Sequence, residues 1–246
     1  MAPSSFYAFF LLLALGAPQR TPAPAPAAQS WSSFLQHLPV NTGPILDYRG
    51  KPVPDQSKHS GIIPYDVGRA DLQQCADALM RLRAEYLFSW QQYDAIGFHF
   101  VGGQYYAWKD YCKGLRPVPK GNGIRWVQGA AQPKDHASLR AYLDLVYTYA
   151  STISLARELK PAAGFAIGTI IIHAGSPGHC FIIIDERTDA AGRHQYRLAE
   201  GYTPAQSIYV LRNPAGAADD PWCTLTSGTI RTASYVFSEY ELKKFE

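Results

Sequence analysis

The chain of 246 residues lacks several features that mark particular classes of protein. It has no block of more than two consecutive lysines or arginines and a net charge of only +3, which argues against nucleic-acid binding. Beyond the first thirty residues it has no apolar run of the ~20 residues that a membrane-spanning helix requires. It has no internal repeat, and no cysteine precedes Cys75, so we expect no lipid anchor on an N-terminal cysteine.

The composition is that of a globular protein. Hydrophobic residues make up 47% of the chain and charged residues 17%, which is enough apolar material for a full core. We expect residues 29–246 to form a single α+β domain. The 16 tyrosines suit contacts with carbohydrate or peptide, although a tyrosine-rich core and rim is the favoured interpretation.

The first 28 residues have the pattern of a signal peptide and a Pro/Ala linker. Residues 6–17 are apolar, too few to span a bilayer, and the segment Ala25-Pro26-Ala27 offers a site for signal peptidase. The pattern departs from the usual one because no lysine or arginine precedes the apolar run. We expect export to the periplasm or the medium, with a mature chain that begins near Ala28.

Two stretches have the apolar spacing of helices. The first is predicted over residues 72–89, with Asp71 as the N-cap and Gln74 three residues later in a capping box. The second is predicted over residues 137–160, capped by Asp135 and apolar nearly all the way round. The second helix is therefore expected to be mostly buried.

Two further features are expected at the surface. Asp77, Arg81 and Glu85 recur every four residues on the polar face of the first helix, which indicates a solvated ladder of ion pairs. Residues 31–65 are rich in proline and glycine and are expected to wrap the domain rather than form its core.

Strands dominate the second half of the chain. Two short strands are predicted first, within residues 95–103 and 123–129, and four more follow, within residues 165–174, 179–188, 194–202 and 207–212. The middle two of these four are joined by a turn, Asp189 to Gly192, that suits a hairpin. Helices first and antiparallel strands second indicate an α+β fold, with an N-terminal helix packed on a C-terminal antiparallel sheet.

Cys75 and His179 form the candidate catalytic pair. Cys75 lies in the first turn of a predicted helix, where the unpaired N–H groups and the positive end of the helix dipole favour a thiolate. A cysteine nucleophile also needs an imidazole, and His179 opens a strand about a hundred residues later. This order and placement are those of papain-like cysteine peptidases and amidases.

Glu200 is the candidate third member of the site. If the hairpin turn centres between Ala190 and Ala191, residues whose numbers sum to 381 oppose each other on the two strands. Glu200 then shares a face with His179 and lies within reach of its side chain. A slip of one residue in the turn would break this relation.

Other interpretations remain open for these residues. Cys75 also falls on the apolar stripe of its helix, so it is a candidate for a buried, inert cysteine, and a single histidine is more often structural than catalytic. Asp185 lies ~20 Å along the strand from His179, too far to orient it. His173 and His179 lack a third ligand at a useful spacing, so we expect no metal site, and nothing indicates a cofactor.

Among the cysteines, one pair is favoured if a disulfide forms. Cys112 and Cys223 both follow aromatic residues in polar, turn-rich segments, and export permits oxidation, so they are the favoured pair. Cys180 alternates with His179 along the strand and is expected to point to the opposite, buried face.

Several long motifs, in order, resemble a known family. They are DLQQCADALMRLRAEYL, KGN, YTYASTISLARELK, GSPGHCFIIID, YTPAQSIYVL and PW. Together they resemble the exported bacterial proteins grouped as domain of unknown function 4846, from about Trp31 to the C-terminus. The family pattern has Asp, Ala and Gln-Ser where this chain has Thr169, Cys180 and Glu200-Gly201, and it matches at Cys75 and His179. The resemblance implies no activity.

The sequence therefore predicts an exported, papain-like cysteine hydrolase that cleaves a peptide or amide bond. Cys75 is the nucleophile, His179 the base and Glu200 the orienting group, and the backbone N–H of Cys75 with Gln74 or Gln73 supplies the oxyanion hole. Cell-wall peptides are the expected substrate by analogy with other exported enzymes of this kind. The alternative is a secreted, non-catalytic module that binds glycan or peptide, in which Cys75 is structural.

Overall fold

The computed structural model of the chain describes Met1 and residues 30–121, 123–217 and 219–246. Apart from Met1, the expected signal peptide and linker lie outside the described residues. The described part is a mixed α+β structure with five α-helices and a large antiparallel sheet. Within it, no helix combines the length and the apolar character needed to cross a bilayer.

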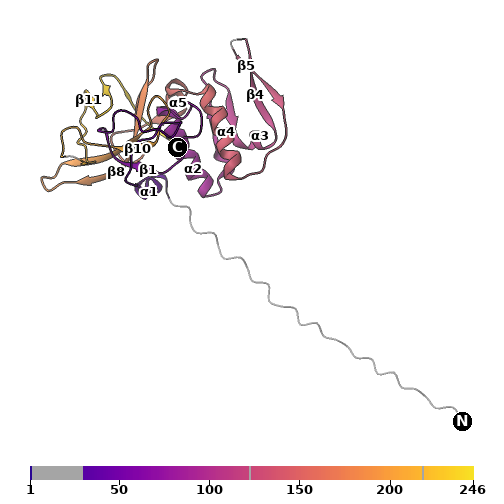
Figure 1. Ribbon diagram of the computed structural model, residues 1–246, viewed down its shortest axis with the longest axis horizontal. Coiled ribbons are helices and arrows are strands. Elements are labelled where there is room, and N and C mark those ends of the chain that lie inside the picture. The colour runs from indigo at the N-terminus through magenta and orange to yellow at the C-terminus, as the bar shows by residue number, and fades with distance from the viewer. Residues whose placement is uncertain (2–29, 122, 218) are drawn as a thin grey trace.

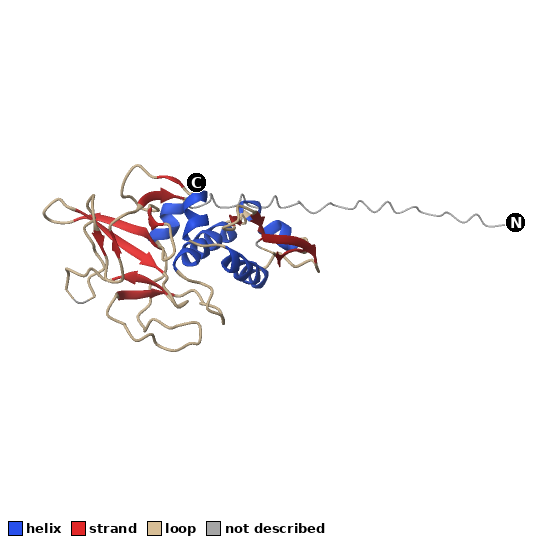
Figure 2. Ribbon diagram, turned by 90° about the horizontal axis from the view of Figure 1, so that it is seen from above, coloured by secondary structure: helices blue, strands red, loops and turns tan. Residues whose placement is uncertain are grey.

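The α-helices lie between the large sheet on one side and a small hairpin on the other (Figures 1 and 2). The helices are α1 (Trp31–Gln36), α2 (Cys75–Ser89), α3 (Trp108–Cys112), α4 (His136–Tyr149) and α5 (Thr152–Glu158), with a 3-10 turn over Tyr93–Ala95. The small hairpin on the helical side consists of β4 (Leu115–Lys120) and β5 (Gly123–Gln128), and another two-stranded pair joins β2 (Gly97–His99) to β3 (Tyr105–Ala107).

The large sheet has seven antiparallel strands in the described chain, in the order β1-β10-β9-β8-β7-β13-β6. Their bounds are β1 (His59–Ile63), β6 (Lys160–Pro161), β7 (Ile170–His173), β8 (His179–Thr188), β9 (His194–Glu200), β10 (Ile208–Leu211) and β13 (Glu241–Lys244). β11 (Ile230–Arg231) pairs with β12 (Val236–Phe237) separately. The four strands predicted in the second half of the sequence are therefore present as β7 to β10.

The β8–β9 hairpin has the predicted register at the site, although its pairing near the turn differs from the prediction. Near the turn, Asp185 opposes Arg197, which is one residue out of the predicted pairing. A bulge between Ile183 and Asp185 corrects the shift, so that Ile183 opposes Leu198 and Ile182 opposes Ala199 as predicted. The bulge thus places Glu200 on the same face of the sheet as His179.

Apolar residues fill both faces of the sheet, which produces two separate cores. Cys180 and Ile182 of β8 point to the core shared with α2 and α4, and Phe181 and Ile183 point to the core closed by β11, β12 and the segments around them. Cys112 belongs to the first core and Cys223 to the second. All four cysteines are free thiols, so the predicted Cys112–Cys223 disulfide is wrong, because the sheet separates the two residues.

β1 corrects the expectation that residues 31–65 only wrap the domain. It pairs with β10 as the edge strand of the large sheet, and Ile63 is completely buried in the core that α2 shares. Gly61 lies within this strand, where a Cβ atom would clash with the side chain of Val40. The alternating signal of a strand was hidden by the prolines and glycines on either side of it.

The second predicted helix is broken in two. α4 begins at His136, with Asp135 accepting a hydrogen bond from the backbone N–H of Ser138, as the predicted N-cap should. It ends at Tyr149, and Ser151 caps a new helix by accepting from the N–H of Ile153. The break turns residues 150–152 toward the first turn of α2, where they help to form a cleft.

Arg81 is buried, which corrects the predicted solvated ladder. Its side chain is 1% exposed and donates to Glu85 Oε1 at 2.6 Å, to Asp66 Oδ1 at 2.8 Å and to Gln73 Oε1 at 3.1 Å. The spacing of four residues does bring Arg81 and Glu85 together, as expected. Residues 65–73 then fold over this face of α2 and remove it from solvent, with the ring of Tyr65 5.2 Å from the guanidinium.

Replacement of Arg81 by methionine is expected to destabilise the protein by about 2–3 kcal/mol. The substitution leaves the buried Glu85 carboxylate without its cation, although His136 Nε2 still lies 2.8 Å from it. The change is measured as the shift in the midpoint of urea unfolding. Arg193→Met serves as the control, because the Arg193 side chain is 67% exposed and its ion pair with Asp189 is solvated, so its midpoint should not move. Equal shifts in the two variants would contradict the role given to Arg81.

Candidate active site

A cleft of about 320 Å³ opens at the N-terminal end of α2. Four segments that are distant in sequence form its walls: the first turn of α2, the junction between α4 and α5, the turn before β8, and the loop after β9. Cys75 lines it as the first residue of α2, 9% exposed, with its sulfur 3.9 Å from the carbonyl oxygen of Gly178. The sheet and α4 lie on opposite sides of α2 at this point (Figure 1).

α2 begins later than predicted, and this places Cys75 at its first position. The residues before it form tight turns, with Leu72 N–H donating to Ala70 and Gln74 N–H donating to the carbonyl of Leu72. Asp71 does not cap the helix, because its carboxylate accepts from the backbone N–H of Ala205 at 2.7 Å. The N-cap is Gln74, so the first unpaired N–H groups of the helix are those at and just after Cys75.

Two glycines allow the strands of the hairpin to approach Cys75. A Cβ atom on Gly178, just before β8, would lie 2.3 Å from Thr152 Oγ1 and 2.7 Å from the carbonyl oxygen of Gly175. A Cβ atom on Gly201, just after β9, would lie 2.7 Å from the Cβ of Ala78 in α2. These contacts need residues without a side chain, and they bring the start of β8 and the end of β9 against the first turns of the helices.

His179 and Glu200 are in direct contact, as the register predicts. His179 Nε2 lies 2.8 Å from Glu200 Oε2, and the other carboxylate oxygen accepts from the hydroxyl of Tyr209 at 2.5 Å. His179 is 3% exposed and Glu200 is completely buried. Because Glu200 engages Nε2, Nδ1 is the ring nitrogen that is left for another partner.

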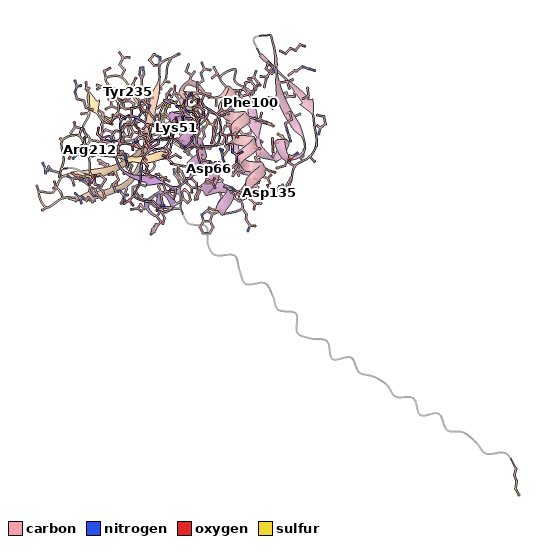
Figure 3. All side chains as sticks on the ribbon, in the orientation of Figure 1. Lys51, Asp66, Phe100, Asp135, Arg212 and Tyr235 are labelled. Carbon is pink, nitrogen blue, oxygen red and sulfur yellow. The ribbon has the colours of Figure 1, made fainter. Side chains whose placement is uncertain are left out.

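An aromatic wall surrounds the other sides of the imidazole. The ring centroid of His179 lies 4.9 Å from that of Tyr235, 5.1 Å from Tyr202 and 5.7 Å from Phe237. Tyr235 lies on the side of the sheet, away from Phe100 and Asp135 on the helical side (Figure 3). The buried Lys58 has its Nζ 4.3 Å from the Tyr202 ring. This packing holds the imidazole in a single orientation.

The pKa of Cys75 is lowered to about 5. The largest cause is a hydrogen bond with the Cys180 thiol; burial opposes it, and the hydrogen bond and charge of His179 and the N–H of Ala76 lower the pKa further. Burial raises the pKa of Cys180 itself well above its usual range, so Cys180 stays protonated and donates to the Cys75 sulfur. Cys180 points to the core shared with α2 and away from the His179 face, as predicted, and the pKa of Cys75 is lowered by both residues.

The pKa of His179 is raised to about 9. Burial acts to lower it, but the hydrogen bonds with Cys75 and Glu200 and the negative charges of these groups outweigh burial. Cys75 is therefore a thiolate and His179 an imidazolium between about pH 5 and pH 9. A paired thiolate and imidazolium is the reactive state of a cysteine nucleophile.

The two glutamines predicted to support an oxyanion have different positions. Gln74 lines the cleft, with its Nε2 donating to Asp71 at 3.2 Å and its Oε1 accepting from Thr203 at 3.2 Å. Gln73 is fully buried and uses its Oε1 to accept from Arg81, so it does not reach the cleft. Of the two side chains, only Gln74 lies where a substrate would bind.

Three residues in and around the site were not anticipated from sequence. Tyr209 opposes Glu200 across β9 and β10, but the loop between these strands is too long to predict their register. Cys180 reaches Cys75 from the other face of β8, and Asp77 lines the cleft from the first turn of α2. The described residues contain no group of three or more His, Cys, Asp or Glu side chains arranged to hold a metal ion.

The model of one protein family matches the chain over residues 19–244, which is most of its length. This chain belongs to the family described as domain of unknown function 4846. The match confirms the resemblance found in the motifs around Cys75 and His179. No curated protein and no solved structure matches the chain.

Proposed function

We propose that this member of domain of unknown function 4846 is a cysteine hydrolase that cleaves peptide or amide bonds. The observation that carries the proposal is the Cys75 thiol in an open cleft, with a pKa that His179 helps to lower, while His179 has a raised pKa and a hydrogen bond to Glu200. A thiol and an imidazole that shift each other's pKa toward the ionised forms are typical of catalytic pairs.

The roles of the groups follow from their contacts. The Cys75 thiolate attacks the carbonyl carbon of the substrate, and the backbone N–H groups at the start of α2, with the Gln74 side chain beside them, stabilise the oxyanion that forms. The imidazolium of His179 gives the proton at Nδ1 to the leaving amine, which leaves a thioester on Cys75. His179 then takes a proton from water, and the resulting hydroxide cleaves the thioester and frees the thiolate.

Glu200 acts through His179. Its hydrogen bond to Nε2 fixes the tautomer and orientation of the ring, and Tyr209 fixes the carboxylate in turn. A cysteine on the first turn of a helix, a histidine at the start of an antiparallel strand and an acceptor on the next strand form the papain-like arrangement. We therefore also propose that the fold is papain-like, that the protein is exported and that its substrate is a cell-wall peptide.

A non-catalytic binding module is the second candidate, and one observation favours it. His179 is 3% exposed, enclosed by Tyr202 and Tyr235, and is not among the residues that line the cleft. In that case the thiolate and imidazolium would be a buried structural pair, and the cleft would bind a peptide or glycan without cleaving it.

An active-site probe separates the two candidates. A peptide carrying a vinyl sulfone at the scissile position is expected to label Cys75 in the native protein, because its alkene accepts a nearby thiolate. Cys75→Ser should remove the label, and His179→Ala should slow labelling about tenfold or more. Mass mapping of the labelled peptide identifies the residue. Equal labelling of the native protein and His179→Ala, or none without denaturant, would refute the hydrolase and leave the binding module.

A further inference from the structure

We infer that the cleft beside Cys75 contains a subsite for a primary ammonium group of the substrate, formed by Asp77 and Tyr147. This inference rests on the proposed function, because it names the class of peptide that the cleft would present to Cys75. It comes from two residues that line the cleft, each with one buried polar atom that has no hydrogen-bond partner in the described structure.

Asp77 is the first of these groups. It lies two residues after Cys75, lines the cleft and is 6% exposed. Its Oδ2 accepts from the backbone N–H of Gln74 at 3.1 Å, whereas its Oδ1 is buried and has no partner. A buried carboxylate oxygen without a donor costs free energy, and a ligand that donates to it recovers that cost.

Tyr147 is the second group. It comes from the last turn of α4, lines the same cleft, and its hydroxyl is buried without a partner. Asp77 and Tyr147 therefore face the same cleft from two different helices, α2 and α4. An –NH₃⁺ group has three donors, so one ammonium bound between the two residues can donate to the carboxylate and to the hydroxyl.

The lining of the cleft favours a cation over an anion. It includes the carboxyl groups of Asp71 and Asp77 and, among the described residues, no lysine or arginine. Burial raises the pKa of Asp77 well above its usual range, so in the absence of a ligand the carboxyl is favoured in its neutral form. An ammonium group that enters the subsite supplies the missing positive charge, and Asp77 then releases its proton to solvent.

Charge selectivity at Cys75 tests the inference without requiring turnover. Two thiosulfonates of similar size are compared at pH 8, (2-aminoethyl)methanethiosulfonate and (2-sulfonatoethyl)methanethiosulfonate. In each case the Cys75 thiolate attacks the sulfur bonded to the ethyl group, a mixed disulfide forms and methanesulfinate leaves. The ratio of the cationic to the anionic rate is divided by the same ratio for N-acetylcysteine, which removes the intrinsic reactivity of the reagents.

Asp77→Asn is expected to lower this ratio about tenfold or more, as the loss of one nearby charge in a partly buried site predicts. Asparagine keeps a carbonyl oxygen that accepts from the Gln74 N–H, so the helix start is retained. Tyr147→Phe is expected to lower the ratio roughly threefold by removing one hydrogen bond. The matched control is Asp185→Asn, six residues further along β8 than His179 and outside the cleft, which should change the ratio less than twofold.

Two peptides distinguish the sources of the ammonium group. Ala-Ala-amide carries it at the α-position, and N-acetyl-Lys-Ala-amide carries it on a side chain. The peptide that fits the subsite should protect Cys75 from iodoacetamide in the native protein, whereas N-acetyl-Ala-Ala-amide should not, and protection should be lost in Asp77→Asn. Protection by the neutral peptide as strong as by the charged ones, or by neither charged peptide, would overturn the subsite.

The outcomes separate the subsite from the proposed function. If Cys75 reacts readily but its charge ratio is the same in native protein and Asp77→Asn, the subsite is wrong and the hydrolase stands. If Cys75 reacts with neither thiosulfonate in the native protein, the proposed function is wrong, and the subsite is wrong with it.

Discussion

The rate at which iodoacetamide alkylates Cys75 is expected to stay nearly constant between pH 6 and pH 8. The pKa of Cys75 is lowered to about 5, so the reactive thiolate is lost only as the pH falls through that value. A thiol of ordinary pKa, ~8.5, gains thiolate nearly a hundredfold over the same interval. The shape of the profile does not depend on how accessible the sulfur is, because access scales the rate equally at each pH.

Two substitutions should shift the profile toward that of an ordinary thiol. His179→Ala removes a hydrogen bond and a positive charge from the thiolate, and Cys180→Ala removes the hydrogen bond that lowers its pKa most. Each is expected to reduce the rate at pH 6 about tenfold, with a much smaller change at pH 9, where the thiolate forms in either case. The alkylated residue is assigned by mass mapping.

Cys223→Ala is the matched control for these variants. It removes another buried thiol, but from the core on the opposite face of the sheet, so the profile of Cys75 should not change. A native profile that rises with pH like that of a free thiol would show that Cys75 is not a stabilised thiolate. It would then be a buried structural cysteine, as its place on the apolar stripe of α2 also suggests.

Glu200→Leu is expected to destabilise the protein by about 4 kcal/mol. The carboxylate is completely buried and joins the His179 ring to the Tyr209 hydroxyl. Leucine fills a similar volume but leaves the ring N–H of His179 and the hydroxyl of Tyr209 without an acceptor. Each unpaired buried group lowers the stability. Urea unfolding at pH 7 measures the loss.

Glu200→Gln distinguishes hydrogen bonding from charge at this position. Its amide oxygen still accepts from His179, so the loss of stability should be only about 1–2 kcal/mol. Glu186→Leu, on the exposed part of β8, is the control and should leave the unfolding midpoint nearly unchanged. If Glu200→Leu unfolds at the same urea concentration as the native protein, Glu200 does not anchor His179.

The strands and the contact between His179 and Glu200 could be predicted from the sequence because they depend on local rules. Alternation and turn residues mark β8 and β9, and opposed residues of a hairpin share a face. The prediction assumed a turn one position away from the real one, and only the bulge before Asp185 corrected it. A bulge has no clear signal in a single sequence, so the register at the site could have been wrong.

The wrong predictions share one cause. Each was made from the residue pattern of a single segment, without the segments that contact it in the folded chain. The face of α2 with Arg81 has the charges of a solvated helix, but residues 65–73 cover it. Asp71 has the position of an N-cap, but its carboxylate binds the N–H of Ala205, more than a hundred residues away. Neither covering segment can be identified until the chain is folded.

By itself, the sequence determined the α+β class, the core strands and the residue types of the site, because helices and strands follow the spacing of apolar residues. It also determined the family, through long motifs that include Cys75 and His179. Only the tertiary structure decided that α2 starts at Cys75, that Cys180 and His179 both lower the pKa of its thiol, and that Asp77 lines the cleft. These contacts depend on how closely Gly178 and Gly201 let the two strands approach the helices, and such packing distances are properties of the folded chain.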